Sequence, residues 1–171
     1  LSEKFDNWTV VAMSRLICNA TLAIRTPPVR NLTLTLQRLP AGYNRVLIAV
    51  ERVNYSRDLE EALDLQTLGA RTGMRVVRCD NLLNGKGTEF AKVKRAYDSP
   101  DPTPMALLTF GMNDKLLTGT DLGTTKAFVT VGNISSSSLV QALGRVFRPV
   151  PGRDVTQPVR MYRIYTSRGG M

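Results

Sequence analysis

The sequence predicts an α/β domain of three layers, with a mainly parallel sheet between two layers of helices. Segments with helical periodicity or helix-capping residues separate most of its apolar runs, and Pro and Gly mark many of the boundaries. Strands and helices that alternate at this spacing are typical of βαβ units, which build parallel sheets covered on both faces. The apolar runs of strand length lie at residues 45–50, 74–79, 105–110, 127–131 and 159–166.

Each element has its own local signal. The run 45–50, Arg-Val-Leu-Ile-Ala-Val, is typical of a strand buried on both faces. Ser56 is expected to cap a helix that includes residues 56–68 and ends near residues 69–73, and its acidic first turn suits the helix dipole. Thr88 is expected to cap a second helix over 88–97, and a third follows the serines at 135–138.

The N-terminal part is predicted to be a connector. A helix is expected from Ser2 to residue 24, with Pro27-Pro28 ending it. The alternation over 32–37 favours a half-buried strand or an interdomain connector. We therefore expect residues 1–40 to be a helix and connector from a preceding domain, and 41–171 to be the domain proper. Because the chain begins with Leu1, we expect it to be a fragment of a larger protein.

The composition limits the kinds of partner and site that the chain can have. The chain has 171 residues, a net charge of +9 and no histidine. This charge favours a polyanionic partner, DNA or RNA. The lack of histidine excludes a His-ligated metal site and a Ser-His-Asp triad within the chain, and no metal site is expected. The two cysteines, Cys18 and Cys79, are interpreted as buried free thiols, which favours an intracellular setting, and no apolar run is long enough to span a membrane.

The segment Ser135–Pro149 carries the most distinctive pattern. As a helix it places Gln141, Gly144, Arg145 and Arg148 on one face. Two guanidinium groups on one rigid helix suit a polyphosphate, because each can make paired bonds to phosphate oxygens. Gly144 costs about 1 kcal/mol relative to Ala in a helix, which makes sense if a ligand or another backbone comes close. The alternative is an amphipathic helix with solvated arginines. Its expected buried face consists of Leu139, Val140, Leu143, Val146 and Phe147.

Three loops are expected beyond the carboxyl ends of the strands, where ligands bind in open parallel sheets. The first carries Arg52 and Asn54, and the second, Asn84–Thr88, joins Lys86 to a helix N-terminus. The third lies within 106–132, where a strand-end hydroxyl and loop amides suit phosphate contacts. Asp121 in this loop has an equally plausible role in an Asx turn. The alternative for Arg52 and Asn54 is ordinary solvated loop residues.

These patterns resemble a known family. Gln141-x-x-Gly144-Arg145-x-x-Arg148 resembles motif VI of superfamily two helicases. Thr109 followed by Gly119-Thr120-Asp121 resembles motif V, and the strand before Arg52 resembles motif IV. In their order, the elements over about residues 45–166 are similar to the second RecA-like domain of these helicases, including viral and phage-type members.

The resemblance implies a three-layer RecA-like (P-loop NTPase-type) domain of an ATP-dependent helicase. ATP and Mg²⁺ would be held mainly by an N-terminal RecA-like partner domain, because this chain lacks a Walker A loop and alone is expected to hydrolyse nothing. Arg148 would be the arginine finger, with Arg145 assisting and Gln141 positioning phosphate or water. The resemblance also implies two sets of binding residues: Gly119, Asp121 and Gly144 for the nucleotide, and Thr109, Thr120, Arg52, Asn54 and Lys86 for the nucleic acid.

Two other functions stay open. One is a non-enzymatic basic α/β module, such as a ribosomal or capsid protein. The other is a degenerate helicase domain that acts as a scaffold. The expected location is the cytoplasm or nucleus, with a viral source as a further expectation.

Overall fold

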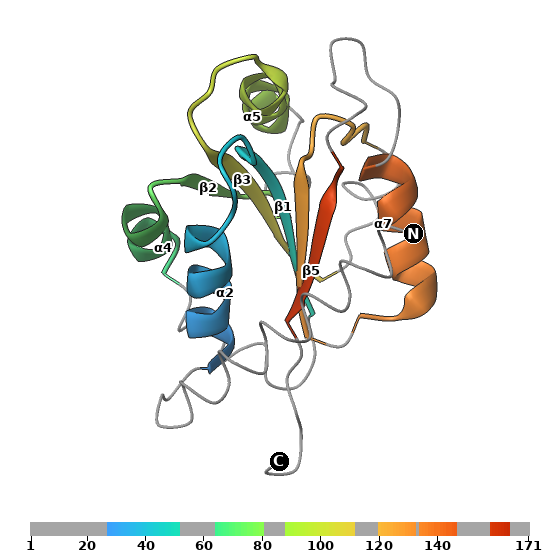
Figure 1. The fold of residues 1–171 in the computed structure, drawn as a ribbon. Coiled ribbons are helices and arrows are strands. Elements are labelled where there is room, and N and C mark those ends of the chain that lie inside the picture. Colours follow the sequence, from blue (N-terminus) through green and yellow to red (C-terminus); the bar gives the residue numbers. More distant parts are fainter. Residues whose placement is uncertain are drawn as a thin grey trace.

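Five apolar runs form one parallel sheet in the computed structural model, which describes residues 27–51, 64–80, 88–111, 120–132, 134–146 and 158–164. Four described helices accompany the strands (Figure 1). The strands are β1 (Arg45–Val50), β2 (Arg75–Arg78), β3 (Met105–Phe110), β4 (Ala127–Val131) and β5 (Arg160–Ile164). The helices are α2 (Pro27–Gln37), α4 (Leu65–Thr72), α5 (Thr88–Asp98) and α7 (Ser136–Val146).

The sheet has the strand order β2-β3-β1-β4-β5, and every pairing is parallel. The central strand β1 lies between β3 and β4, where Ile48 is opposite both Leu108 and Val129. All six residues of β1 are buried, which explains why its sequence is apolar without alternation.

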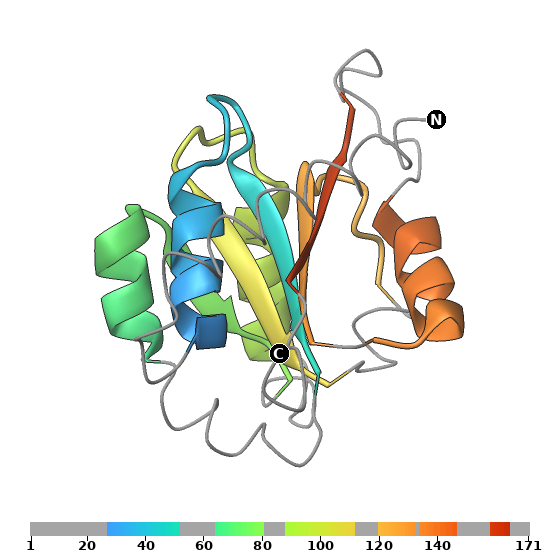
Figure 2. The same ribbon diagram turned by 60° about the horizontal axis from the view of Figure 1, so that its bottom comes forward.

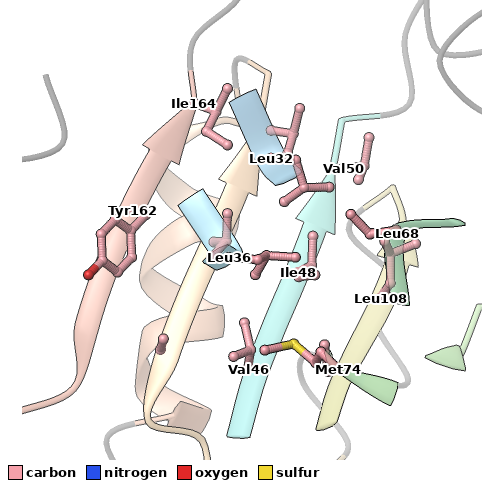
Figure 3. Packing of buried hydrophobic residues seen from close by; sticks show 14 of the residues in the cluster. Leu32, Leu36, Val46, Ile48, Val50, Leu68, Met74, Leu108, Tyr162 and Ile164 are labelled. Atoms are coloured by element: carbon pink, nitrogen blue, oxygen red, sulfur yellow. The ribbon is translucent and has the colours of Figure 1, made fainter. Parts of the chain in front are cut away.

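Two hydrophobic clusters fill the spaces on either side of the sheet. Leu32 and Leu36 of α2 and Leu68 of α4 pack on one face, against alternate residues such as Ile48 (Figure 3). The helices α5 and α7 cover the other face (Figure 2), and their buried side chains belong to the second cluster. The predicted three-layer RecA-like fold with a mainly parallel sheet is therefore confirmed.

The strand or connector predicted over 32–37 is wrong, because this segment is the helix α2. Pro27 and Pro28 stand in the first turn of α2, which needs no N–H from them. The helix expected from Ser2 to residue 24 lies outside the described residues. Thr33 Oγ1 donates to Val29 O at 2.8 Å and Thr35 Oγ1 to Asn31 O at 2.7 Å, so these β-branched hydroxyls are satisfied within the helix. Because α2 packs into the core of the sheet, the expected boundary after residue 40 does not separate it from the domain.

The helix predicted over 56–68 is also revised. Asp64 has an extended backbone and caps α4, with its carboxylate accepting from Gln66 N at 3.0 Å and from Thr67 Oγ1 at 2.7 Å. These bonds lower the pKa of Asp64, the one from Thr67 most. A continuous helix through residue 64 is excluded, and the segment 52–63 lies outside the described residues. The predicted end near 69–73 is confirmed, because Gly73 caps α4 with φ +68°.

Arg45 fixes the amino ends of the strands. Its side chain donates to five backbone carbonyls at 2.5 to 3.1 Å, although the residue is only 5% exposed. The acceptors belong to Asn44, to Tyr97 in the last turn of α5 and to the stretch between α5 and β3, which the guanidinium therefore holds against the start of β1. These acceptors are the carbonyl oxygens of Asn44, Tyr97, Ser99, Asp101 and Thr103.

Candidate nucleotide and nucleic-acid interface

The helix α7 is attached to the sheet by one side. Leu139, Ala142 and Val146 are buried in the cluster on that face of the sheet, and Leu143 packs against it. At its start, Ser135 Oγ accepts from Ser138 N at 3.4 Å and donates to Ser138 Oγ at 2.9 Å. α7 begins near the carboxyl ends of the strands and runs back toward their amino ends (Figure 1). Its orientation is therefore fixed by packing.

The outer side of α7 carries Gln141, Gly144 and Arg145. Gln141 and Gly144 are exposed and Arg145 is half-buried. The Arg145 guanidinium makes no hydrogen bond or ion pair to any residue within the described ranges. A Cβ built on Gly144 has nothing within 4 Å, so packing inside this chain does not require a glycine there. An uncompensated cation beside open backbone is an arrangement suited to a phosphate from outside the chain.

Val140 corrects one sequence expectation. It was expected on the buried face but is 67% exposed, beside Gln141 and one turn before Gly144. The reason is geometric: Leu139, Ala142 and Val146 define the inner stripe, and Val140 lies about 100° from Leu139 around the axis. Ala142 takes the buried place expected for Val140. Phe147 and Arg148 lie outside the described residues.

The segment 120–126 lies in the same layer as α7. Leu122 is buried in the cluster that contains Leu139 and Val146 of α7. Thr125 Oγ1 shares a hydrogen bond of 2.8 Å with Tyr97 OH, and Thr124 Oγ1 donates to Asp98 Oδ1 at 2.7 Å, so the segment is attached to the end of α5. The structure therefore places this part of the motif V-like sequence and α7 on one face of the sheet.

Asp121 forms an Asx turn. Its exposed carboxylate accepts from Gly123 N at 3.0 Å, which is the alternative that the sequence left open. Thr120, next to it, is half-buried. Gly119 lies outside the described residues, as do Arg52, Asn54 and Lys86.

Thr109 is fully buried near the carboxyl end of β3. Its hydroxyl donates to Gly111 O at 3.3 Å, and Gly111 N donates to Val50 O at 2.6 Å. Gly111 has φ +80°, a conformation that favours glycine. In this structure Thr109 thus shapes the turn that leaves β3 instead of presenting its hydroxyl on the surface, where the sequence analysis had expected a backbone contact.

Thr130 is a second buried threonine in the same row of the sheet. Both Thr109 and Thr130 are opposite Ala49 of β1, one on each side. Thr130 Oγ1 has no hydrogen-bond partner among the described residues. No local sequence pattern distinguishes Thr130, because only the strand register shows that the two threonines are neighbours of one alanine.

The sequence also did not predict a structural role for Asp80 and Arg78. Arg78 Nε and Nη2 donate to the Asp80 carboxylate at 2.9 to 3.1 Å, and the guanidinium lies 4.6 Å from the centre of the Phe110 ring. Asp80 Oδ1 accepts from Phe110 N at 3.3 Å. The three residues connect the carboxyl ends of β2 and β3. Between them, burial and the nearby Asp80 carboxylate raise the pKa of the Cys79 thiol to about 12, so it stays protonated at neutral pH.

The charges of α5 are largely compensated within the helix. Lys94 pairs with Asp98, and Lys92 lies 4.0 Å from Glu89. Within the described ranges, no three His, Cys, Asp or Glu side chains gather as a potential metal site, and no helix is long and apolar enough to cross a membrane. Among the described residues, the outer side of α7 with Arg145 is a candidate phosphate-binding surface.

A scan against protein-family models finds no family that matches this chain, and a search of curated proteins finds no match.

Proposed function

We propose that this chain is the C-terminal motor domain of an ATP-dependent nucleic-acid helicase or translocase. The observation that carries this proposal is α7, whose inner stripe is buried while Gln141 and Gly144 are exposed and the half-buried Arg145 has no partner among the described residues. A rigid helix with an uncompensated cation is preorganised to stabilise negative charge that develops on a phosphate.

The roles on α7 follow from the chemistry of the side chains. Arg148, four residues after Gly144 in the sequence, is proposed as the finger that reaches the γ-phosphate when the two domains close. Arg145 would assist it, Gln141 would position phosphate or water, and Gly144 would leave room for close approach. An arginine finger contributes about 10³- to 10⁵-fold to the rate of related phosphoryl transfers. ATP and Mg²⁺ would be held mainly by the N-terminal RecA-like partner domain, since the sequence of this chain has no Walker A loop.

Nucleic acid is proposed to contact the loops at the carboxyl ends of the strands. Arg52, Asn54 and Lys86 would contact phosphates there. Thr120, which precedes the segment that enters β4 at the amino ends of the strands, would contact the backbone separately. The Arg78–Asp80–Phe110 unit would support this edge by fixing the start of the loop after β3. Asp121 would link the nucleotide and nucleic-acid sites through its turn, with Gly119 beside it. The assay described below identifies the polymer as DNA or RNA. We also propose an intracellular location and a viral source.

A second candidate is a non-enzymatic basic module that binds nucleic acid. Exposed arginines that have no partner among the described residues also occur away from α7, which favours binding by charge alone. An inactive helicase-like scaffold would bind in the same way. Neither alternative turns over ATP, so hydrolysis separates them from the motor.

The test is ATP hydrolysis by the longer protein that contains this chain and its partner domain, with and without single- and double-stranded DNA and RNA. We expect turnover that one polymer stimulates. Arg148→Lys should lower turnover at least about a hundredfold while nucleic-acid binding is nearly unchanged, because a point charge does not replace a guanidinium fork.

Arg95→Lys is the matched control, since Arg95 is an exposed arginine on α5 and outside the proposed site. It should leave turnover within about twofold, as expected for a surface substitution of equal charge. Equal turnover in the Arg148→Lys variant and the unmutated protein would exclude the finger. An unmutated protein without turnover under any condition would favour the basic module or the scaffold.

A further inference from the structure

A buried hydrogen bond joins the end of α5 to the segment that leads into β4. Tyr97 OH and Thr125 Oγ1 lie 2.8 Å apart, and both residues are fully buried. The neighbouring residues repeat the connection nearer the surface, where Thr124 Oγ1 donates to Asp98 Oδ1 at 2.7 Å. Two consecutive residues of α5 thus hold two consecutive residues of the segment 120–126.

Arg45 fixes both sides of this connection. Its Nε donates to Tyr97 O at 2.7 Å, and its own carbonyl oxygen accepts from Lys126 N at 2.8 Å. The backbone on each side of the bond between Tyr97 and Thr125 is therefore attached to one residue at the start of β1. A hydroxyl pair in such a frame has a narrow range of positions, because hydrogen bonds weaken when their length or angle changes.

The anchored segment contains the turn of Asp121. Gly123 N donates to the Asp121 carboxylate at 3.0 Å, and Thr125 N donates to Leu122 O at 3.0 Å. These two bonds overlap in sequence, so a shift of Thr125 moves the turn as well. Leu122 is buried in the same cluster as Leu139 of α7. The position of Thr125 therefore helps to set where the Asp121 turn lies relative to α7.

The motor function described above gives the Tyr97 hydroxyl no role. Burial raises the pKa of Tyr97 above its ordinary value, so the hydroxyl stays protonated at physiological pH. Packing alone does not require this hydroxyl, since a phenylalanine ring fills nearly the same space. Apolar packing has no direction, whereas a satisfied buried hydrogen bond specifies one arrangement. The hydroxyl pair therefore fixes the segment more sharply than packing would.

We propose that Tyr97 is a positioning residue, whose bond to Thr125 holds the Asp121 turn in the place where nucleic-acid binding can stimulate ATP hydrolysis. This inference rests on the proposed motor function, in which Asp121 links the nucleotide and nucleic-acid sites. Tyr97 touches neither ligand in this role, because it is fully buried and acts through Thr125.

The test compares the longer protein that contains this chain and its partner domain with its Tyr97→Phe variant. ATP hydrolysis is measured with and without the stimulating polymer. Stimulation should fall by about fivefold or more, the scale on which residues between two sites alter their coupling. Turnover without the polymer should stay within about twofold, because the outer side of α7 is unchanged. Unchanged stimulation would overturn the role of Tyr97.

A double variant separates positioning from stability. Tyr97→Phe leaves the Thr125 hydroxyl buried without a partner, which also destabilises the fold. Adding Thr125→Val removes both hydroxyls, so the midpoint of urea unfolding should return toward that of the unmutated protein. Stimulation should nevertheless stay low, since the directional bond is absent. Recovery of stimulation together with stability would overturn the proposal, and the double variant decides the question should Tyr97→Phe alone not fold.

Two control variants keep a hydroxyl at the anchor or remove one elsewhere. Thr125→Ser retains the hydroxyl and should retain stimulation, whereas Thr125→Val should lose it. Tyr43→Phe removes the hydroxyl of a buried tyrosine on the other face of the sheet, where it donates to Pro158 O at 3.1 Å. This matched control should leave stimulation within about twofold. A loss equal to that in Tyr97→Phe would overturn the proposal.

Hydrogen exchange of the same proteins, followed by mass spectrometry, measures the anchor without ATP. Peptides covering 120–126 should exchange faster in Tyr97→Phe than in the unmutated protein, while peptides from β1 should not change. Equal exchange over 120–126 would overturn the anchor. An unmutated protein without turnover would overturn the motor function and the role of Tyr97 in it. Normal turnover with equal stimulation in both proteins would overturn the role of Tyr97 alone.

Discussion

The space available for a side chain differs between two helical glycines, Gly144 and Gly69. In α7, a Cβ at Gly144 would meet nothing within 4 Å. In α4, a Cβ at Gly69 would lie 2.8 Å from Met74 O, a backbone atom that cannot move without disturbing the turn into β2. Packing therefore requires a glycine at position 69, whereas no contact among the described residues requires one at position 144.

The pair gives a prediction of opposite sign. Gly144→Ala should stabilise the chain by about 0.5 to 1 kcal/mol, because alanine is the better helix former. Gly69→Ala should destabilise it by about 1 to 3 kcal/mol, the usual cost of a forced contact. Urea unfolding of both variants measures these changes. A destabilised Gly144→Ala variant would mean that the outer side of α7 is already in contact within the chain.

Single residues also show where sequence reasoning ends. The spacing of Gln141, Gly144 and Arg145 was readable because a helix repeats every 3.6 residues, so their shared face follows from local geometry alone. Arg45 was read only as the first residue of a strand. Its five carbonyl partners include residues 52 to 58 positions away, which no local pattern reveals.

At the scale of elements, the strands were predicted well and α2 was not. β3 and β4 have the predicted bounds because buried parallel strands are continuous apolar runs between turn residues. In α2, leucines at every second position imitate a half-buried strand. Leu32 and Leu36 are also one helical turn apart, and tertiary packing selects this periodicity over the other.

The two periodicities make different predictions for two leucines of α2. Leu36 is 4% exposed in the core, whereas Leu34 is only half-buried. Leu36→Ala should lower the free energy of unfolding by about 2 to 5 kcal/mol, because it removes packed atoms and leaves a cavity. Leu34→Ala should cost about 1 kcal/mol, in proportion to its smaller buried area. Chemical denaturation of the two variants decides, and equal losses would instead suit a strand that buries both leucines.

For the whole molecule, function and charge depend on which segments the sheet brings together. The α5 and α7 layer holds the motif V-like segment together with α7, which are separate in the sequence. This arrangement could be predicted because both parts resemble known motifs. In the other helix layer, α2 and α4 are joined by a bond from Gln37 to Arg71 O, 34 residues apart in the chain, which no local pattern predicts.

The order of the strands also sets the distribution of stability. β1 has a strand on each side, helices above and below it, and six buried residues, whereas β2 is a four-residue edge strand that begins with an exposed arginine. Amide hydrogen exchange should therefore be slowest in β1 and the neighbouring parts of β3 and β4, where opening needs global unfolding.

Exchange in β2 should be faster, because this edge can open with α4 while the other strands stay paired. Native-state hydrogen exchange at increasing urea concentration, followed by NMR, measures both free energies of opening. We expect the amides of β1 to follow the global unfolding curve and those of β2 to open at a lower free energy that depends weakly on urea. Equal free energies and equal urea dependence would instead mean that the edge and the centre of the sheet unfold together.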